Sequence, residues 1–385
     1  MFLLADYYDS FSCVGGSCLN TCCAGWQIEV DSQTLDMYRE KSDSFSEYVR
    51  ANLIYSEGGA KVRLTEERRC PFLNSENLCD IYTHWGDTYM GDTCCAFPRI
   101  IWQTPEVTLL AHSLSCEEVL RILFAKVSPV ALCSEIAEGE KEIALDTLPN
   151  YSIYQFVLWS LEMLQDTSHT FGEALAAVVS MGLKSQTAMQ SHDMEGMDNL
   201  LKQSDRVLSD VRRGYDVIDK SERVVEPLIA SIVDSFWQMV HSRDSYKQGM
   251  FYWCEDYFSW DKNTRHQKIL EHIKEYKVSA AHITFYRKLS AAFILAQSYR
   301  FTTEEGVKNV LQSCLLNYII LVDILPLFWN VEFGTAEYFA RIAHIGRIFE
   351  YTGGWINDIL APAVAGETGA DLDTYIAVLL LRYGI

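Results

Sequence analysis

The chain has 385 residues, of which 49% are hydrophobic and 22% are charged. This composition is typical of a globular protein and excludes a largely disordered chain. The formal net charge of −20 disfavours binding to phosphate backbones, so nucleic acid is not expected as a partner. The same charge would attract basic or lysine-rich protein surfaces.

No membrane-spanning segment is expected. The N-terminal stretch MFLLADYYDSF lacks the basic region and the long apolar run of a secretory signal peptide. The longest apolar stretch, residues 318–329, contains Asp323 and Pro326 and is too short to cross a bilayer. The sequence therefore predicts a cytoplasmic protein for which peripheral membrane contact stays possible.

The N-terminal part of the chain contains short segments with strand-like alternation. We expect strands in residues 26–30 and 61–64, and two strands around a turn in residues 99–113. Between the first two strands, Asp31 is a good N-cap for a helix that continues to about Tyr55.

The remainder of the chain has helical periodicity. Ser115 and Glu118 have the spacing of a capping box at the start of a helix. Apolar residues at spacings of three and four predict helices over residues 152–164, 170–183, 223–240, 268–299 (two helices), 307–325, 337–351 and 372–384. The polar segment 191–205 is expected to form a surface loop or a short exposed helix.

These elements predict a mainly α fold with two domains. Residues 1–120 would form a cysteine-rich metal- or Fe–S-binding module with short β-strands, and residues 121–385 a multi-helix domain that could bind the substrate. The glycine-containing stretches 55–62, 351–358 and 364–373 are interpreted as turns between helices, because none follows a convincing buried strand as a nucleotide-binding loop would.

The cysteines carry the strongest chemical signal. Eight of the twelve precede residue 96, and the first block has the spacing C-x4-C-x3-C-C. In a reducing cytosol such clustering favours metal binding over disulfides or buried free thiols. Paired C-x2-C motifs, which are typical of zinc sites, are absent, and the adjacent Cys22 and Cys23 suit a larger cluster or two separate centres. An iron–sulfur cluster is therefore favoured, and zinc remains the alternative.

Other candidate residues are weaker. His84 lies between two cysteines and could be a ligand or make an ordinary polar contact. Cys133, Cys254 and Cys314 are expected in the core. The aromatic stretch 251–260 is expected to belong to the core or to a groove for a partner.

Ordered motifs around the cysteines resemble the flagellin lysine-N-methylase family, whose N-terminal region is related to cysteine-rich putative zinc- or iron-chelating domains. The resemblance covers residues 11–120. The matching residues are Phe11, Cys13, Cys18, Cys22, Cys23, Trp26, Ile28, Asp31, Cys70, Pro71, Phe72, Leu73, Leu78, Cys79, Asp80, Ile81, Thr93, Cys94, Phe97, Pro98, Arg99, Leu114, Ser115, Cys116 and Glu118.

The resemblance implies methyl transfer from S-adenosylmethionine to lysine side chains of flagellin, with a [4Fe–4S] cluster required. The metal ligands it implies are Cys13, Cys18, Cys22, Cys23, Cys70, Cys79, Cys94 and Cys116. Cys95 is left out because the family usually has another residue there. No catalytic residue or cosubstrate pocket is located. A zinc-stabilised helical binding module, an Fe–S electron-transfer protein and an oligomer remain possible.

Overall fold

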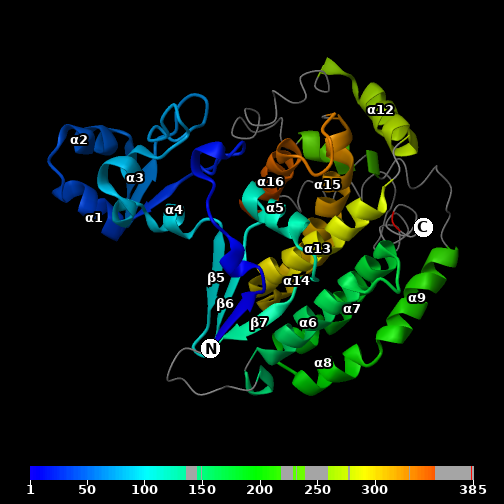
Figure 1. Cartoon of the computed structure of the whole chain (residues 1–385). Helices are drawn as coiled ribbons and strands as arrows, with labels where there is room; N and C mark the ends of the chain where they lie inside the picture. Colours follow the sequence, from blue (N-terminus) through cyan, green and yellow to red (C-terminus); the bar gives the residue numbers. More distant parts are fainter. Residues whose placement is uncertain are drawn as a thin grey trace.

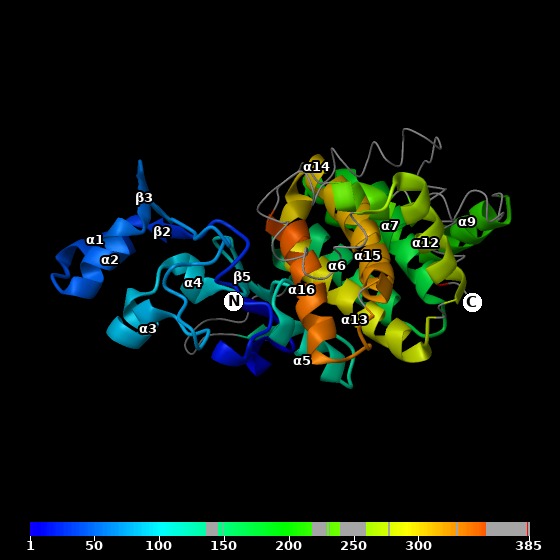
Figure 2. The same ribbon diagram turned by 90° about the horizontal axis from the view of Figure 1, so that it is seen from above.

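The computed structural model describes residues 1–135, 145–148, 150–217, 229–230, 232–238, 259–275, 278–328, 330–351 and 383. The described chain is mainly helical with a few short strands, which confirms the predicted fold class. Figures 1 and 2 show two neighbouring parts. Helices α1 to α4 and the strands β2 to β4 lie to one side of a larger helical body, and β5 leads from α4 toward it. The predicted domain boundary at residue 120 stays a prediction.

A four-stranded sheet lies against the helical body. Its strands are β1 (Phe2–Ala5), β5 (Arg99–Gln103), β6 (Thr108–His112) and β7 (Leu132–Glu135), in the order β5-β6-β1-β7. Strands β5 and β6 form the antiparallel pair that the sequence predicts. Strand β1 pairs in parallel with β6 and antiparallel with β7, and neither β1 nor β7 was predicted.

A second, three-stranded sheet belongs to the smaller part. Its order is β2 (Glu29–Asp31), β4 (Gly59–Val62) and β3 (Leu53–Ser56). The predicted helix end at Tyr55 is therefore wrong, because Tyr55 lies in β3 opposite Ala60. The glycine-containing stretch there is a turn between strands rather than between helices. A side chain at position 59 would lie 2.6 Å from the carbonyl oxygen of Val30, so the close strand pairing requires glycine.

The single helix predicted after Asp31 is two helices, α1 (Ser32–Glu40) and α2 (Ser44–Ala51). Asp31 is the predicted N-cap and accepts a 2.8 Å hydrogen bond from the backbone N–H of Thr34. Asp43 caps the second helix in the same way through the N–H of Ser46. This second cap starts a new helix at a point where the sequence pattern predicted that the first helix would continue.

The predicted capping box at Ser115 is not formed. Helix α5 (Glu117–Ala125) begins after Cys116, which is its N-cap and makes no side-chain capping bond. Glu118 instead pairs with Arg121, and the backbone N–H of Ser115 donates to the hydroxyl of Ser113. Burial of Ser115 in the larger core therefore overrides the local capping pattern.

The single helix expected over residues 307–325 is divided between three helical elements, whereas the helices expected over residues 152–164, 170–183, 268–299 and 337–351 are confirmed. The remaining helices also include several that the sequence did not predict. Their bounds are α3 (Asp80–Trp85), α4 (Asp92–Ala96), α6 (Tyr151–Gln165), α7 (Phe171–Gln190), α8 (Met194–Leu201), α9 (Ser204–Val217), α12 (Lys262–Glu275), α13 (Ala280–Gln297), α14 (Glu304–Lys308), the π-helix Asn309–Leu316, α15 (Asn317–Phe328) and α16 (Ala336–Tyr351). Short 3-10 helices cover Tyr8–Ser10, Gly15–Ser17, Asp87–Tyr89, Leu145–Thr147 and Ser298–Thr302. The polar segment 191–205 contains α8.

Several predictions fall on residues outside the described ranges. Of the predicted helix 223–240, only residues 229–230 and 232–238 are described, and these are helical. Of the segment 372–384, only Tyr383 is described. The aromatic stretch 251–260 lies outside apart from its last two residues, and the glycine-containing stretch 364–373 lies outside completely, as does 351–358 after Tyr351.

Two separate apolar cores stabilise the described chain. The larger core joins the four-stranded sheet to the helices, and it includes Leu3 from β1 and Leu120 from α5. The smaller core gathers Val30, Tyr38 and Phe72 with the buried Cys70. In the described residues, no helix is long and apolar enough to cross a bilayer.

Candidate metal centre

The first cysteine block forms a loop that lies between the smaller part and the helical body. A 3-10 helix, Gly15–Ser17, sits in it, and Gly15 and Gly25 adopt φ values of 55° and 85° that favour glycine. The loop is tied to the second block by backbone bonds. The N–H of Cys70 donates to the carbonyl oxygen of Cys23 at 2.7 Å, and the N–H of Gly25 donates to Arg68.

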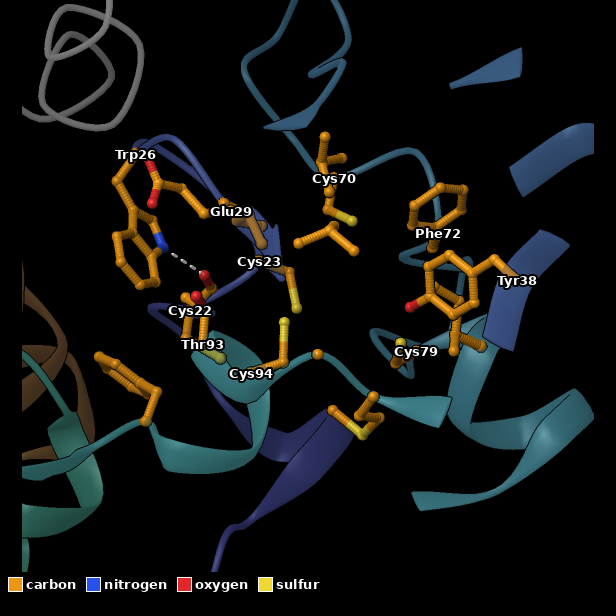
Figure 3. Close-up of a pocket in the computed structure, with 17 residues that line it drawn as sticks. Cys22, Cys23, Trp26, Glu29, Tyr38, Cys70, Phe72, Cys79, Thr93 and Cys94 are labelled. Atoms are coloured by element: carbon orange, nitrogen blue, oxygen red, sulfur yellow. Dashed lines mark hydrogen bonds between the residues drawn. The ribbon is translucent and has the colours of Figure 1, made fainter. Parts of the chain in front are cut away.

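Four of the predicted ligands converge on one cavity of about 70 Å³, which also has Cys22 in its wall. They are Cys23, Cys70, Cys79 and Cys94, and we call them the first cysteine group. Figure 3 shows the sulfurs of Cys23 and Cys94 pointing toward one another, with the side chain of Cys70 turned toward the same space. Cys79 is the N-cap of α3 and Cys94 lies in α4. Residues far apart in the sequence are thus brought to one site.

The walls of this cavity are mainly apolar. Trp26, Ile28, Phe72 and Phe97 contribute to the lining, together with Tyr38. The indole N–H of Trp26 donates a 2.6 Å hydrogen bond to the carbonyl oxygen of Cys22, which Figure 3 marks with a dashed line. Tyr38 donates to the carbonyl oxygen of Tyr89 at 2.8 Å. The polar atoms of these two wall residues are satisfied within the protein.

The thiols of the first group influence one another's protonation. Burial, with smaller contributions from the charges of Cys23 and Cys79, raises the pKa of Cys70 to about 12. Burial also raises the pKa of Cys94, with added contributions from Cys23, Cys70 and Cys79. The pKa of Cys23 is raised first by a hydrogen bond with the Cys22 side chain and then by burial. The charges of the other thiols in the group are thus among the causes that raise the pKa of Cys70 and of Cys94.

The other four predicted ligands belong to the first cysteine block and to the N-cap of α5. Cys13, Cys18, Cys22 and Cys116 form the second cysteine group. Burial, with contributions from the charge of Glu117 and then that of Cys116, raises the pKa of Cys18 to about 12. Burial likewise raises the pKa of Cys116 to about 11, with a contribution from Cys13. Cys22 is adjacent to both groups, since it also lines the first cavity.

Two charged residues that the sequence analysis did not single out hold this loop. Glu117, 8% exposed, accepts hydrogen bonds from the backbone N–H groups of Leu19 at 2.9 Å and Asn20 at 2.7 Å. Arg347 on α16 is 4% exposed and donates to the carbonyl oxygens of Thr21 at 3.1 Å and Ala24 at 2.9 Å.

The described cysteines are all free thiols. The described part of the chain contains no group of three or more His, Cys, Asp or Glu side chains already arranged to hold a metal ion. The donor chemistry nevertheless fits a soft cation, because each group offers four thiols.

The weaker candidates are placed elsewhere. His84 is exposed, forms a 2.9 Å hydrogen bond with the carbonyl oxygen of Asp80 and stacks on Phe45. Cys95 is also exposed, and its thiol donates to the carbonyl oxygen of Met90. The prediction that Cys133 lies in the core is wrong, because it is exposed on the edge strand β7. Cys254 and the side chain of Cys314 lie outside the described residues.

Curated proteins with similar sequences provide a direct comparison. The chain is 25% identical over 187 residues to a protein of Salmonella typhimurium named lysine-N-methylase, and equally similar to one of the same name from Salmonella choleraesuis. These are distant relatives. Each match covers 46% of this chain and 45% of the relative, so the chain spans less than half the length of these two proteins in the alignment.

A further relative points to the flagellar system. The chain is 29% identical over 138 residues to a protein of Salmonella muenchen named flagellar biosynthetic protein FliU, and the match covers 34% of this chain and 78% of that protein. No protein-family model and no solved structure matches the chain. The comparisons therefore support a distant relationship to proteins with lysine-methylase and flagellar names.

Proposed function

We propose that the protein is a methyltransferase that moves the methyl group of S-adenosylmethionine to lysine side chains of flagellin. The convergence of Cys23, Cys70, Cys79 and Cys94 on one cavity is the observation that carries the proposal, because these residues belong to the motifs that resemble the family. The names of the distant relatives support both the reaction and the flagellar context.

The first cysteine group would hold a [4Fe–4S] cluster. Four thiols meet the usual ligand requirement of such a cluster, and the apolar walls would shield it from water. When bound with all four cysteine ligands, the cluster would supply electron transfer. Each thiol that becomes a ligand gives its proton to solvent. The small core around Phe72 would also gain a cross-link between distant segments.

In the proposed reaction a bond forms between the lysine Nζ and the methyl carbon while the bond from that carbon to the sulfonium sulfur breaks. The amine must be neutral to attack, so one proton leaves the lysine and S-adenosylhomocysteine is the second product. The net charge of −20 would favour approach of a lysine-rich protein surface. Among the described residues, those at the cavity wall would exclude water from the cysteines.

The experiment that tests this function uses the full chain purified without oxygen. Incubation with S-adenosylmethionine carrying a labelled methyl group and with flagellin should give methyl-lysine, detected by mass spectrometry. Cys70→Ser and Cys79→Ser should lose both iron and methyl transfer, whereas the exposed Cys133→Ser should keep both. If flagellin carries no label after incubation with the iron-loaded wild-type protein, the proposed reaction is wrong.

A second candidate function is a zinc-stabilised module that binds a protein partner without catalysis. The same four thiols favour it, because sites with four cysteine ligands are common for structural zinc. Stoichiometric zinc without iron or sulfide after anaerobic purification would support this candidate. A reversible redox couple in a protein that methylates nothing would instead indicate electron transfer.

A further inference from the structure

A cluster of aromatic rings reaches the surface of the smaller part, where α1, α2 and α3 lie together (Figures 1 and 2). The ring of Phe45 on α2 stacks on His84 at 4.2 Å between centroids and meets Trp85 edge-on at 5.0 Å. Trp85 lies 5.6 Å from Tyr89, and Phe45 lies 6.2 Å from Tyr48. All five residues are exposed or half-buried. We call these five rings the aromatic surface.

An ammonium group already lies on two of these rings. The Nζ of Lys41 is 4.2 Å from the centroid of the Tyr89 ring and 5.6 Å from that of Trp85, within the range of cation–π attraction. Asp43 adds negative charge beside them, because its carboxylate accepts a 3.2 Å hydrogen bond from the indole N–H of Trp85. Aromatic faces next to a carboxylate are suited to a lysine side chain.

The side chain of Lys41 is free to leave this position. Its ammonium forms no ion pair and donates no hydrogen bond within the described part of the chain, so the rings are its contacts there. The backbone is fixed separately, because the carbonyl oxygen of Lys41 accepts hydrogen bonds from Arg50 and from the hydroxyl of Ser46. Another ammonium can therefore take the place on the rings without a change in the chain.

The charges around the aromatic surface fit a basic partner. Residues 36–50 and 80–92, which form this surface, contain seven acidic and three basic residues. Arg39 is paired with Asp36, and Arg50 donates to backbone carbonyl oxygens. Lys41 is the third basic residue. The acidic residues are therefore in excess, and they would attract the lysine side chains of another protein.

The aromatic surface lies next to the wall of the first cysteine group. Tyr38 lines that cavity, as Figure 3 shows, and its ring centroid is 5.6 Å from that of Trp85. The hydroxyl of Tyr38 also donates to the carbonyl oxygen of Tyr89 at 2.8 Å. A partner held by Trp85 and Tyr89 would thus be in contact with residues that pack directly on the cavity wall.

We infer that Trp85, Tyr89 and Asp43 form a docking site for a lysine side chain of a protein partner, and that Lys41 occupies this site until the partner displaces it. Docking exchanges one ammonium group for another on the same rings, and no covalent bond changes. The inference goes beyond the proposed function, because it does not depend on methyl transfer.

The test measures binding of a fluorescently labelled peptide of lysine and glycine residues to the full chain, without S-adenosylmethionine. Trp85→Leu and Tyr89→Leu should each weaken binding by roughly 3–10-fold, because one ring face is lost. Tyr55→Leu is the matched control, since it removes an exposed tyrosine of β3 that lies outside the aromatic surface, and it should leave the affinity unchanged. Wild-type affinity in both ring variants would overturn the inference.

The charge of the partner is tested with a second peptide that has norleucine in place of lysine. It should not bind measurably, because norleucine has a similar chain length but no ammonium group. If it binds as tightly as the lysine peptide, the surface recognises apolar side chains and the inference is wrong.

The role of Lys41 is tested by Lys41→Ala. The vacated rings should bind the lysine peptide roughly threefold or more tightly. Lys61→Ala is the control, because it removes the same charge from an exposed side chain of β4 and should have a smaller effect. An equal gain in both variants would mean that only net charge matters, and it would refute displacement of Lys41.

A measurement on the wild-type chain keeps the inference testable where a variant fails to fold. A peptide with trimethylated lysines keeps its positive charge but cannot be acetylated. Adding it should speed acetylation of the Lys41 amine by roughly twofold or more and leave Lys61 unchanged, as measured by mass spectrometry. An unchanged or slower reaction at Lys41 would contradict displacement. Failure of the protein to methylate flagellin would remove the proposed function and leave this inference intact.

Discussion

The carboxylate of Glu117, at the start of α5, accepts a 2.7 Å hydrogen bond from the backbone N–H of Asn20, 97 residues earlier in the chain. Together with the bond to Leu19, it fixes the loop between the cysteines of the first block. This contact links the cysteine-rich segment to the helical body without a disulfide. Figure 1 shows α5 beside α16, the helix that carries Arg347. The loop is therefore held by two adjacent helices.

Glu117→Gln should loosen this loop. The amide keeps one acceptor oxygen but loses the other, so one of the two backbone N–H groups becomes unsatisfied, at about 1–2 kcal/mol. Hydrogen exchange of the Leu19 and Asn20 amides should become roughly tenfold faster. The control is Glu47→Gln, an exposed residue that likewise lies in the first turn of its helix. Unchanged exchange at both amides would show that Glu117 does not hold the loop.

Arg347→Met should destabilise the metal-free protein. The substitution removes the donors to four carbonyl oxygens, and we expect a loss of about 2–4 kcal/mol in the free energy of unfolding. Urea denaturation measures it. Arg39→Met is the comparison, because Arg39 forms an exposed pair with Asp36 and its loss should change stability by less than about 1 kcal/mol. If both substitutions reduce the free energy of unfolding by the same amount, the hydrogen bonds of Arg347 do not stabilise the protein as expected.

Gly16→Ala should disturb the packing of the two cysteine blocks. A Cβ at position 16 would lie 2.5 Å from the backbone carbonyl oxygen of Glu76, which cannot move as a flexible side chain could. We expect a loss of about 1–3 kcal/mol in stability. Gly214→Ala in α9 meets no atom within 4 Å and should instead add up to about 1 kcal/mol. Thermal unfolding of both variants tests the contrast, and a stable Gly16 variant would contradict it.

The buried carboxyl of Glu350 should make the free energy of unfolding depend on pH. Burial raises the pKa of its carboxyl from 4.5 to about 7, although hydrogen bonds from Ser113 and Leu114 oppose the shift. The folded protein therefore binds a proton that the unfolded chain releases above pH 4.5. The resulting stabilisation is complete below that pH and disappears as the pH rises to about 7.

Glu350→Gln removes this proton equilibrium. Between pH 4.5 and 7, the wild type should lose roughly 2–3 kcal/mol of stability relative to this variant. Urea denaturation at the two pH values gives the difference, and exposed Glu332→Gln serves as control. A wild-type-to-variant difference that is the same at both pH values would disprove the assignment.

Local patterns in the sequence were sufficient for much of the fold. Regular apolar spacing located α6, α7, α13 and α16, since one helix face must be buried whichever neighbour covers it. The pattern failed where distant partners decide the structure. Strand β1 pairs with β6 across about a hundred residues, and its short apolar run has no local signature.

The sequence by itself determined that eight cysteines with ordered flanking residues are candidate metal ligands, because residue type and spacing are local properties. Only the tertiary structure decided their grouping. It placed Cys23, Cys70, Cys79 and Cys94 around one cavity with Cys22 in its wall, and it placed the buried charge of Arg347 against the backbone of the loop between Cys18 and Gly25. Local spacing could not predict this arrangement, because the segments that form the cavity are distant in the sequence and meet only when the chain folds.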